Sequence, residues 1–408
     1  MTTRTTFARV VTTTDVHSAL GDATGMLSHL HSLRPTSLIA DCGDFFEGTG
    51  YYQLGAGRLE REILTTLYDV LAPGNHGWPH YFEPTLHELT VCANAMNDTD
   101  GRPLFHRLRI VDIGGRQVAV TAVISPQAFD AIPAHQRAGQ HVTDPVGALR
   151  EVLLEHHDHV DAWIVLSHSG FETDLKLAEH CPFVDIVFAG HCHSDLYGPA
   201  HVGDTLVVKG PELAAGYAAA EPVGAGWAAR TTCFPKAAAV PDALADLTDK
   251  ITETGRMLTA VLGTVNEPYR NTVVDRRQLL SEVAARLHTG LGATVILNET
   301  ALRPAYLGDT ITLGALLAVE PFGNQLVHAF LTDEHSQHPA RLLAHLTKRA
   351  GPLVTAPHPL PARIRSVLTT AYLADSYLTG RTYEAGLKLG DAVRHVLAAP
   401  PRAEGVSR

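Results

Sequence analysis

Five short apolar runs, each followed at once by a turn rich in Gly, Asp or His, constrain this sequence more than any other feature. They are residues 8–15 (ARVVTTTD), 37–44 (SLIADCGD), 69–76 (DVLAPGNH), 162–169 (AWIVLSHS) and 184–193 (VDIVFAGHCH). Apolar runs of this length are typical of central strands in a buried sheet. The polar turns predict an α/β domain whose strands carry a site on the loops at their carboxyl ends.

Turn-forming and loop-forming residues along the rest of the chain predict how it divides into domains. Residues 107–125 alternate around Gly114-Gly115 and predict a β-hairpin. A Pro/Ala-rich break at 234–241 precedes a segment with helical spacing. We therefore predict a first domain over 1–240, a linker helix over 241–262 and a smaller α/β domain over 263–408.

Composition bears on location and partners. The formal net charge of -11 argues against a protein that coats nucleic acid, and a phosphate-binding enzyme with this balance needs bound cations or a local Arg cluster. The N-terminus lacks the apolar region of a secretory signal, and no run approaches a membrane span. Five scattered cysteines indicate reduced thiols. We expect a cytoplasmic protein with a small-molecule substrate, no membrane or nucleic-acid partner, and an oligomeric state that the sequence does not indicate.

The turns after the apolar runs contain metal-ligand residues in a fixed order. The motifs are Asp15-x-His17, Gly43-Asp44, Gly74-Asn75-His76, His168 in LSHSG, and Gly190-His191-Cys192-His193. Each motif alone is common, but all five in order after apolar runs are hard to produce by accident. Carboxylate, amide and imidazole donors suit Mn, Zn, Fe or Co at a catalytic centre. Two such ions about 3.5–4 Å apart can clamp a phosphate and activate water.

With these motifs the chain resembles the calcineurin-like metallophosphoesterases, specifically the two-domain 5'-nucleotidase family. The resemblance implies a four-layer α/β/β/α metallophosphoesterase domain followed by a smaller α/β substrate-binding domain. It implies one metal site from Asp15, His17, Asp44 and His193, and a second from Asp44, Asn75, His168 and His191. Asp44 would bridge two divalent ions, and a bridging hydroxide would attack phosphorus in line. His76 would contact the phosphate and stabilise charge on the leaving oxygen.

The resemblance continues into residues 296–327, which contain the motif Pro-Phe-Gly-Asn. It implies that Arg303 helps to bind the substrate, that Phe322 stacks on a base, and that Asn324 contacts the base edge. Tyr372 matches a second stacking aromatic residue. The alternative for both aromatic residues is ordinary core packing.

Several positions depart from the family pattern. Gly77 and Pro79 stand where nucleotidases carry acidic residues, so His76 lacks its usual carboxylate partner unless another carboxylate substitutes. The loop at 299–303 is bulkier than Gly-Gly-x-Arg. A ribose-contacting loop is replaced by residues 374–383, where Asp375 is a candidate substitute.

Together these features predict a phosphomonoesterase that removes the 5'-phosphate of a nucleotide or analogue, in a specialised nucleoside biosynthetic pathway. One alternative is a phosphodiesterase or cyclic-nucleotide hydrolase on the same metals. Another is a nucleotide-binding protein that has lost turnover. The metal identity and the base and sugar preference stay open.

Overall fold

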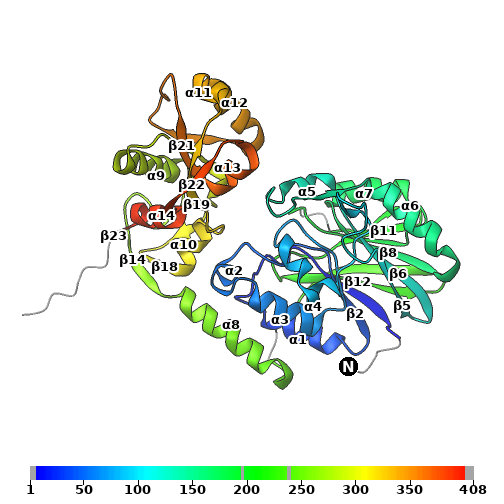
Figure 1. The fold of residues 1–408 in the computed structure, drawn as a ribbon. Helices are drawn as coiled ribbons and strands as arrows, with labels where there is room; N and C mark the ends of the chain where they lie inside the picture. The colour runs from blue at the N-terminus through cyan, green and yellow to red at the C-terminus, as the bar shows by residue number, and fades with distance from the viewer. Residues whose placement is uncertain (1–5, 194–196, 237–239, 400–408) are drawn as a thin grey trace, which may run out of the picture. The chain divides into compact units, whose positions relative to one another are not determined.

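The computed structural model describes residues 6–193, 197–236 and 240–399 (Figure 1). The chain forms two compact units: residues 1–47 with 55–253, and residues 48–54 with 254–408. The change of unit at 253–254 falls within helix α8 (Ala245–Leu258), inside the segment predicted as a linker. The assignment of 48–54 to the second unit has no counterpart in the sequence prediction. The predicted roles of the two domains remain predictions.

The described part of the first unit contains two large sheets and the two-stranded sheet β4-β7. In one large sheet, the strand order is β13-β12-β1-β2-β3, and β1, β2 and β3 run parallel. In the other, the order is β10-β11-β9-β8-β6-β5, and β6, β8, β9 and β11 run parallel. The predicted hairpin is confirmed, with Ile113 opposite Arg116 across the Gly114-Gly115 turn. The strands are β1 (Arg9–Thr13), β2 (Ser37–Asp41), β3 (Val70–Leu71), β5 (Leu108–Ile113), β6 (Arg116–Ile124), β8 (Ala162–His168), β9 (Ile186–Ala189), β10 (Ala200–Val202), β11 (Thr205–Lys209), β12 (Gly216–Val223) and β13 (Gly226–Cys233).

Apolar side chains fill the space between the two sheets, and helices cover their outer faces. Val10 and Leu38 of the first sheet share a buried core with Val120 and Ile164 of the second. A further core that includes Leu149 lies between the second sheet and helices α6 and α7. Helices α1 and α3 cover the first sheet (Figure 1). These layers confirm the predicted α/β/β/α arrangement. The remaining elements of the first unit are α1 (Thr24–Leu33), α3 (Arg58–Leu67), η1 (Trp78–Phe82), α4 (Pro84–His87), β4 (Ala95–Asn97), α5 (Pro126–Ala131), β7 (Gln140–Val142), α6 (Pro145–His156), η2 (His157–His159), α7 (Phe171–His180) and η3 (Asp242–Leu244). Helix α2 (Gly50–Gly55) falls almost wholly in the segment 48–54 of the second unit.

The second unit is built on a five-stranded sheet in the order β20-β16-β21-β19-β22. One face of this sheet packs Leu297 against Leu280 of α9, and the other packs Ile296 against Leu342 of α12. This confirms a smaller α/β unit. Its elements are β14 (Val261–Val265), β15 (Thr272–Val273), α9 (Arg276–Leu291), β16 (Val295–Asn298), η4 (Glu299–Ala301), β17 (Tyr306–Leu307), β18 (Thr310–Thr312), α10 (Leu313–Val319), β19 (Gln325–Phe330), α11 (Asp333–Gln337), α12 (Pro339–Ala350), β20 (Leu353–Ala356), β21 (Ser366–Thr370), α13 (Ala371–Tyr377), β22 (Thr382–Lys388), α14 (Leu389–Leu397) and β23 (Ala398–Ala399).

Strand register brings two of the predicted substrate residues to the same end of two neighbouring strands of this sheet. Strands β19 and β21 are antiparallel, and Leu326 lies opposite Thr370. Phe322 therefore precedes β19 at the same edge where Tyr372 follows β21. Within the described ranges, no helix has both the length and the hydropathy needed to cross a membrane.

Candidate active site

The predicted metal ligands lie at the carboxyl ends of parallel strands. His168 is the last residue of β8, Asp15 follows β1 by two residues, and His191 follows β9 by two residues. Asp44 follows the end of β2 by three residues, and Asn75 follows the end of β3 by four. Because β1–β3 and β8–β9 belong to different sheets, the two sheets both contribute loops to one site.

Side chains from distant parts of the chain form three overlapping groups of possible metal ligands. In each group, the ligand atoms lie within 4.8 Å of one another. The groups are Asp15, His17 and His193; His17, Asp44 and His76; and Asp44, His168 and His191. One oxygen of Asp44 lies 3.3 Å from Nε2 of His168, and the other lies 3.8 Å from Nε2 of His17. Asp44 therefore belongs to two of the three groups and faces a different histidine with each of its oxygens.

His168 is oriented by the backbone. Its Nδ1 lies 2.8 Å from the carbonyl oxygen of Cys42, which can only accept a hydrogen bond. The hydrogen therefore lies on Nδ1. The other ring nitrogen, Nε2, faces Asp44 and lies 3.1 Å from the side-chain oxygen of Asn75. This contact places Asn75 beside the group that contains Asp44, His168 and His191.

A buried lysine supports His193 through a carboxylate. Lys209 is fully buried, and its ammonium group pairs with one oxygen of Glu212. The other oxygen of Glu212 pairs with Nδ1 of His193. This pairing leaves Nε2 of His193 for the site, as in metal centres where a carboxylate orients the ligating imidazole. Local sequence spacing did not indicate either Lys209 or Glu212.

Burial and close charges shift several pKa values in the site. Burial raises the pKa of Asp15 to about 6. Burial acts in the same direction on Asp44, but the nearby His168, His76 and His17 outweigh it and lower its pKa. The pKa of His168 is raised to about 9, because Asp44 and Asp15 outweigh the opposing effect of burial. Burial lowers the pKa of His191 to about 4.

The donor set fits divalent cations. Carboxylate oxygens and imidazole nitrogens gather around Asp44 in a region where Asp15, Asp44 and His168 are buried. Carboxylates that lie this close in a buried region repel one another unless positive charge lies between them. Nitrogen and oxygen donors in this mixture are those that Mn, Fe, Zn and Co accept.

Backbone strain and close packing are concentrated in the same loops. Asp15, His17, Asp44 and His191 all have φ between +49° and +74°, a conformation that side-chain-bearing residues adopt infrequently. A Cβ atom on Gly74 would lie 2.2 Å from both the amide nitrogen and Oδ1 of Asp44. The glycine of Gly74-Asn75-His76 is therefore required for the loop to approach the central carboxylate.

His76 has a carboxylate partner that the sequence did not identify. Its Nδ1 lies 3.0 Å from Oε2 of Glu47, and its backbone N–H donates to Oδ1 of Asp44 at 2.8 Å. The usual partner positions hold Gly77 and Pro79, and of the two alternatives left open by the sequence, the structure favours substitution by another carboxylate. Glu47 comes from the loop after β2, so no spacing within the His76 loop could have revealed it.

The predicted substrate residues lie in the second unit. The guanidinium of Arg303 lies 5.5 Å from the ring centre of Phe322, which covers part of one ring face. The amide nitrogen of Asn324 donates to Glu320 at 2.9 Å. The hydroxyl of Tyr372 lies 3.1 Å from that of Tyr377. Phe322 and Tyr372 are each 37% exposed, which favours available ring surface over core packing.

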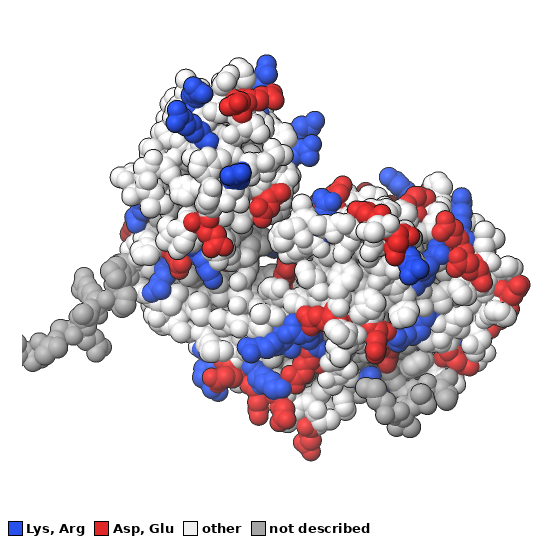
Figure 2. Space-filling view, in the orientation of Figure 1, with Lys and Arg blue, Asp and Glu red and all other residues white. Residues whose placement is uncertain are grey.

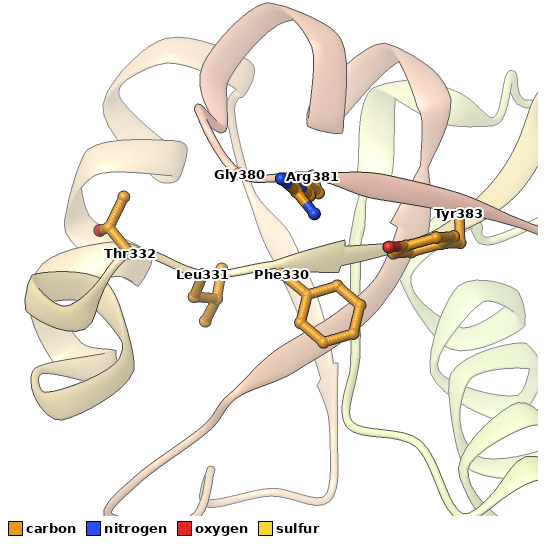
Figure 3. A pocket seen from close by; sticks show the side chains of 6 residues that line it. All are labelled: Phe330, Leu331, Thr332, Gly380, Arg381 and Tyr383. Carbon is orange, nitrogen blue, oxygen red and sulfur yellow. The ribbon is translucent and has the colours of Figure 1, made fainter.

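A cavity of about 340 Å³ lies at the other edge of the same sheet (Figure 3). Phe330 at the end of β19 and Tyr383 at the start of β22 pack edge to face there, beside Arg381. Because Phe322 and Phe330 lie at opposite ends of β19, this cavity is separate from the predicted base-stacking position. On the face of the molecule drawn in Figure 2, basic and acidic side chains of the described residues are interspersed.

Comparison with known proteins gives sequence relatives over part of the chain. No protein-family model matches it. Mouse 5'-nucleotidase is 29% identical over 178 residues, which cover 40% of this chain and 30% of that protein. The cattle enzyme is 26% identical over 223 residues, which cover 46% of this chain and 38% of that protein. The chain thus matches about a third of the length of these relatives.

Comparison with solved structures shows that nearly the whole chain shares its fold with known proteins. A 5'-nucleotidase precursor from Thermus thermophilus superposes with a TM-score of 0.70 and 18% identity, over 97% of this chain and 98% of that one. The sulfate thiohydrolase SoxB from the same organism gives a TM-score of 0.65 and 18% identity, over 95% of this chain and 83% of that one. The chain therefore has the two-domain fold of these solved structures, and part of its sequence is similar to 5'-nucleotidases.

Proposed function

We propose that this chain is a metal-dependent phosphomonoesterase that removes the 5'-phosphate of a nucleotide or nucleotide analogue. The observation that carries this proposal is the position of Asp44, whose two oxygens face two separate groups of ligand side chains. A pair of cations held by a shared carboxylate is a recurrent arrangement in phosphate ester hydrolysis. The sequence relatives named 5'-nucleotidase support the same reaction class.

We assign the cation ligands as the resemblance implies, because the contacts in the site are compatible with that division. One ion would be held by Asp15, His17, Asp44 and His193, and the other by Asp44, Asn75, His168 and His191. Bound divalent ions supply positive charge to the phosphate oxygens and lower the pKa of a coordinated water. The donor types suit Mn, Zn, Fe or Co.

Two protein groups would do the remaining work at the phosphate. His76 lies beside His17 and Asp44 and would give a proton to the leaving oxygen as the bond to phosphorus breaks. Oδ1 of Asp44 accepts a hydrogen bond from the backbone N–H of His76, and this contact holds the His76 ring close to the ligand groups.

Nucleoside recognition would come from the second unit. Arg303, Phe322 and Tyr372 would hold the substrate, with Asn324 at the base edge. The exposed ring surfaces of Phe322 and Tyr372 support a stacking role, which contributes about 1–3 kcal/mol per base in comparable proteins. The amide of Asn324 is held by Glu320, which fixes the direction in which its oxygen would accept.

We also propose a cytoplasmic location and a specialised role in nucleoside biosynthesis. All five cysteines are free thiols, and three of them are buried, which supports a reducing compartment. The altered ribose-side segment at 374–383 supports a sugar other than plain ribose.

The proposal is tested by phosphate release with added Mn²⁺ from ribo-, deoxyribo- and sugar-modified nucleoside monophosphates. We expect release that is lost in Asp44→Ala. Faster release from sugar-modified substrates than from AMP would support the specialised role, and the reverse order would contradict it. No release from any monoester would reject the proposed function.

Two further arms of the same assay address the alternatives. Faster hydrolysis of bis-p-nitrophenyl phosphate than of any monoester would indicate a phosphodiesterase. Tight, metal-dependent nucleotide binding without release would indicate a binding protein. The contact between Glu47 and His76 counts against that second alternative, because its main support was a histidine without a carboxylate partner.

A further inference from the structure

The loop that carries His76 is held by a carboxylate from another motif. Oε2 of Glu47 lies 3.0 Å from Nδ1 of His76, and Oε1 accepts a hydrogen bond from the backbone N–H of Gly77 at 3.1 Å. Both oxygens of Glu47 are thus engaged by consecutive residues of one loop. This two-point contact fixes the plane of the imidazole ring relative to the loop backbone.

The His76 loop itself has no room for such a carboxylate at its next residue. Gly77 has φ +69°, and a Cβ atom there would lie 2.4 Å from Cβ of Phe46. Phe46 fills this space, and Glu47 follows it directly in the chain. The segment that excludes a side chain at position 77 therefore also supplies the acid.

The backbone at Glu47 has an uncommon conformation. Its φ is +64°, which costs free energy for a residue with a side chain. The same left-handed conformation occurs at Asp44, three residues earlier. Together the two turns direct both carboxylates to the His76 loop: Asp44 accepts from the backbone N–H of His76, and Glu47 contacts its ring.

We propose that Glu47 is the positioning residue of His76. This inference rests on the proposed phosphomonoesterase function. The carboxylate accepts a hydrogen bond from Nδ1 and fixes the ring, so that Nε2 faces the leaving oxygen. As the bond between phosphorus and that oxygen breaks, Nε2 gives its proton to the oxygen. After the alcohol leaves, a proton from bulk solvent restores the ring, and the proton lost by the attacking water is released to bulk solvent.

The decisive variant is Glu47→Gln, which keeps an acceptor for the Gly77 N–H but removes the negative charge. We expect kcat for nucleoside monophosphates to fall about 10- to 100-fold, with KM changed less than about two-fold. For p-nitrophenyl phosphate, whose leaving group needs no proton, we expect little loss. Glu47→Asp should recover part of the activity on nucleoside monophosphates.

The matched control is Glu83→Gln, because Glu83 lies 2.7 Å from Nδ1 of His80 in the same kind of pair outside the ligand groups. It should leave both substrates unaffected. In a His76→Ala background, Glu47→Gln should cause no further loss, since its effect passes through the ring. Metal content, measured on each variant, should equal that of the wild type.

Equal losses on both substrates, additive losses in the double variant, or loss of bound metal would overturn the positioning role. Should the wild type release no phosphate from any monoester, the proposed function fails by itself. The inference is then decided by ring ¹⁵N–¹H spectra of the metal-loaded protein. A His76 Nδ1 proton signal that disappears in Glu47→Gln supports the contact, and an unchanged signal contradicts it.

Discussion

The metal-ligand groups of the first unit differ in burial and in number of fixed contacts from the aromatic residues Phe322 and Tyr372 of the second unit. Asp15, Asp44 and His168 are buried, and each has contacts from other loops that fix its direction. Phe322 and Tyr372 are each 37% exposed, and their contacts leave ring surface uncovered. Rigid strand ends can hold a demanding arrangement of charges, whereas exposed side chains can be exchanged without unfolding a core. With the proposed function, this difference predicts that reaction chemistry and substrate choice can be altered independently.

Two solved structures share the fold of this chain. A 5'-nucleotidase precursor and a sulfate thiohydrolase both share the two-domain architecture with this chain. The names of these two proteins describe different substrates. Fold alone therefore does not fix the substrate, and the comparison between the two regions has to be tested residue by residue.

The largest expected effect comes from Asp44→Asn, which removes the central charge of the ligand groups. Because cation charge stabilisation amounts to several kcal/mol, kcat/KM should fall by at least about 10³-fold. The loss should be equal for AMP and for p-nitrophenyl phosphate, which has no base. Asp98→Asn, in an exposed pair with His141, is the control. A loss confined to AMP would break the proposed separation.

Glu212→Gln should have the next largest effect, and it should act on cation binding. The substitution weakens the support of His193 but leaves Asp44, His168 and His191 intact. We expect about 10- to 100-fold weaker binding of one Mn²⁺ of two, measured by calorimetry. Glu221→Gln on β12 is the control. Equal weakening of both ions, or of neither, would show that Glu212 does not act through His193 alone.

Phe322→Ala tests the second unit directly. Loss of the stacked ring should weaken binding of AMP by about 1–3 kcal/mol, which raises KM for AMP roughly 5- to 150-fold. KM for p-nitrophenyl phosphate, which has no base, should stay unchanged. Phe330→Ala is the matched control, because Phe330 is a similarly exposed phenylalanine at the opposite end of β19. An equal effect of both variants would assign the change to folding of the sheet rather than to base stacking.

Tyr372→Phe should have the smallest effect. It removes the hydroxyl that lies 3.1 Å from Tyr377 and keeps the ring. One exposed hydrogen bond contributes about 1 kcal/mol or less, so KM for AMP should change less than about five-fold. Steady-state kinetics over a range of AMP concentrations measure this change. A larger rise would mean that the hydroxyl itself contacts the nucleotide.

Much of the architecture was accessible from local pattern. Residues 37–44 and 162–169 were predicted as strands ending in ligand loops, and β2 and β8 confirm them. The hairpin at Gly114-Gly115 was also confirmed. These features depend on residues adjacent in the chain, where apolar runs and turn residues are read directly. The inclusion of residues 48–54 in the second unit has no such signal, because it depends on packing between distant segments.

The sequence by itself determined which side chains can bind cations and that they follow strands in order. Only the tertiary structure decided which carboxylate supports which histidine: Glu47 contacts His76 across 29 residues, and Glu212 contacts His193 across 19. The physical reason is that a hydrogen bond requires two atoms within about 3 Å. Sequence spacing sets such a distance within one loop. Between loops, it is set by how the sheets and their turns pack.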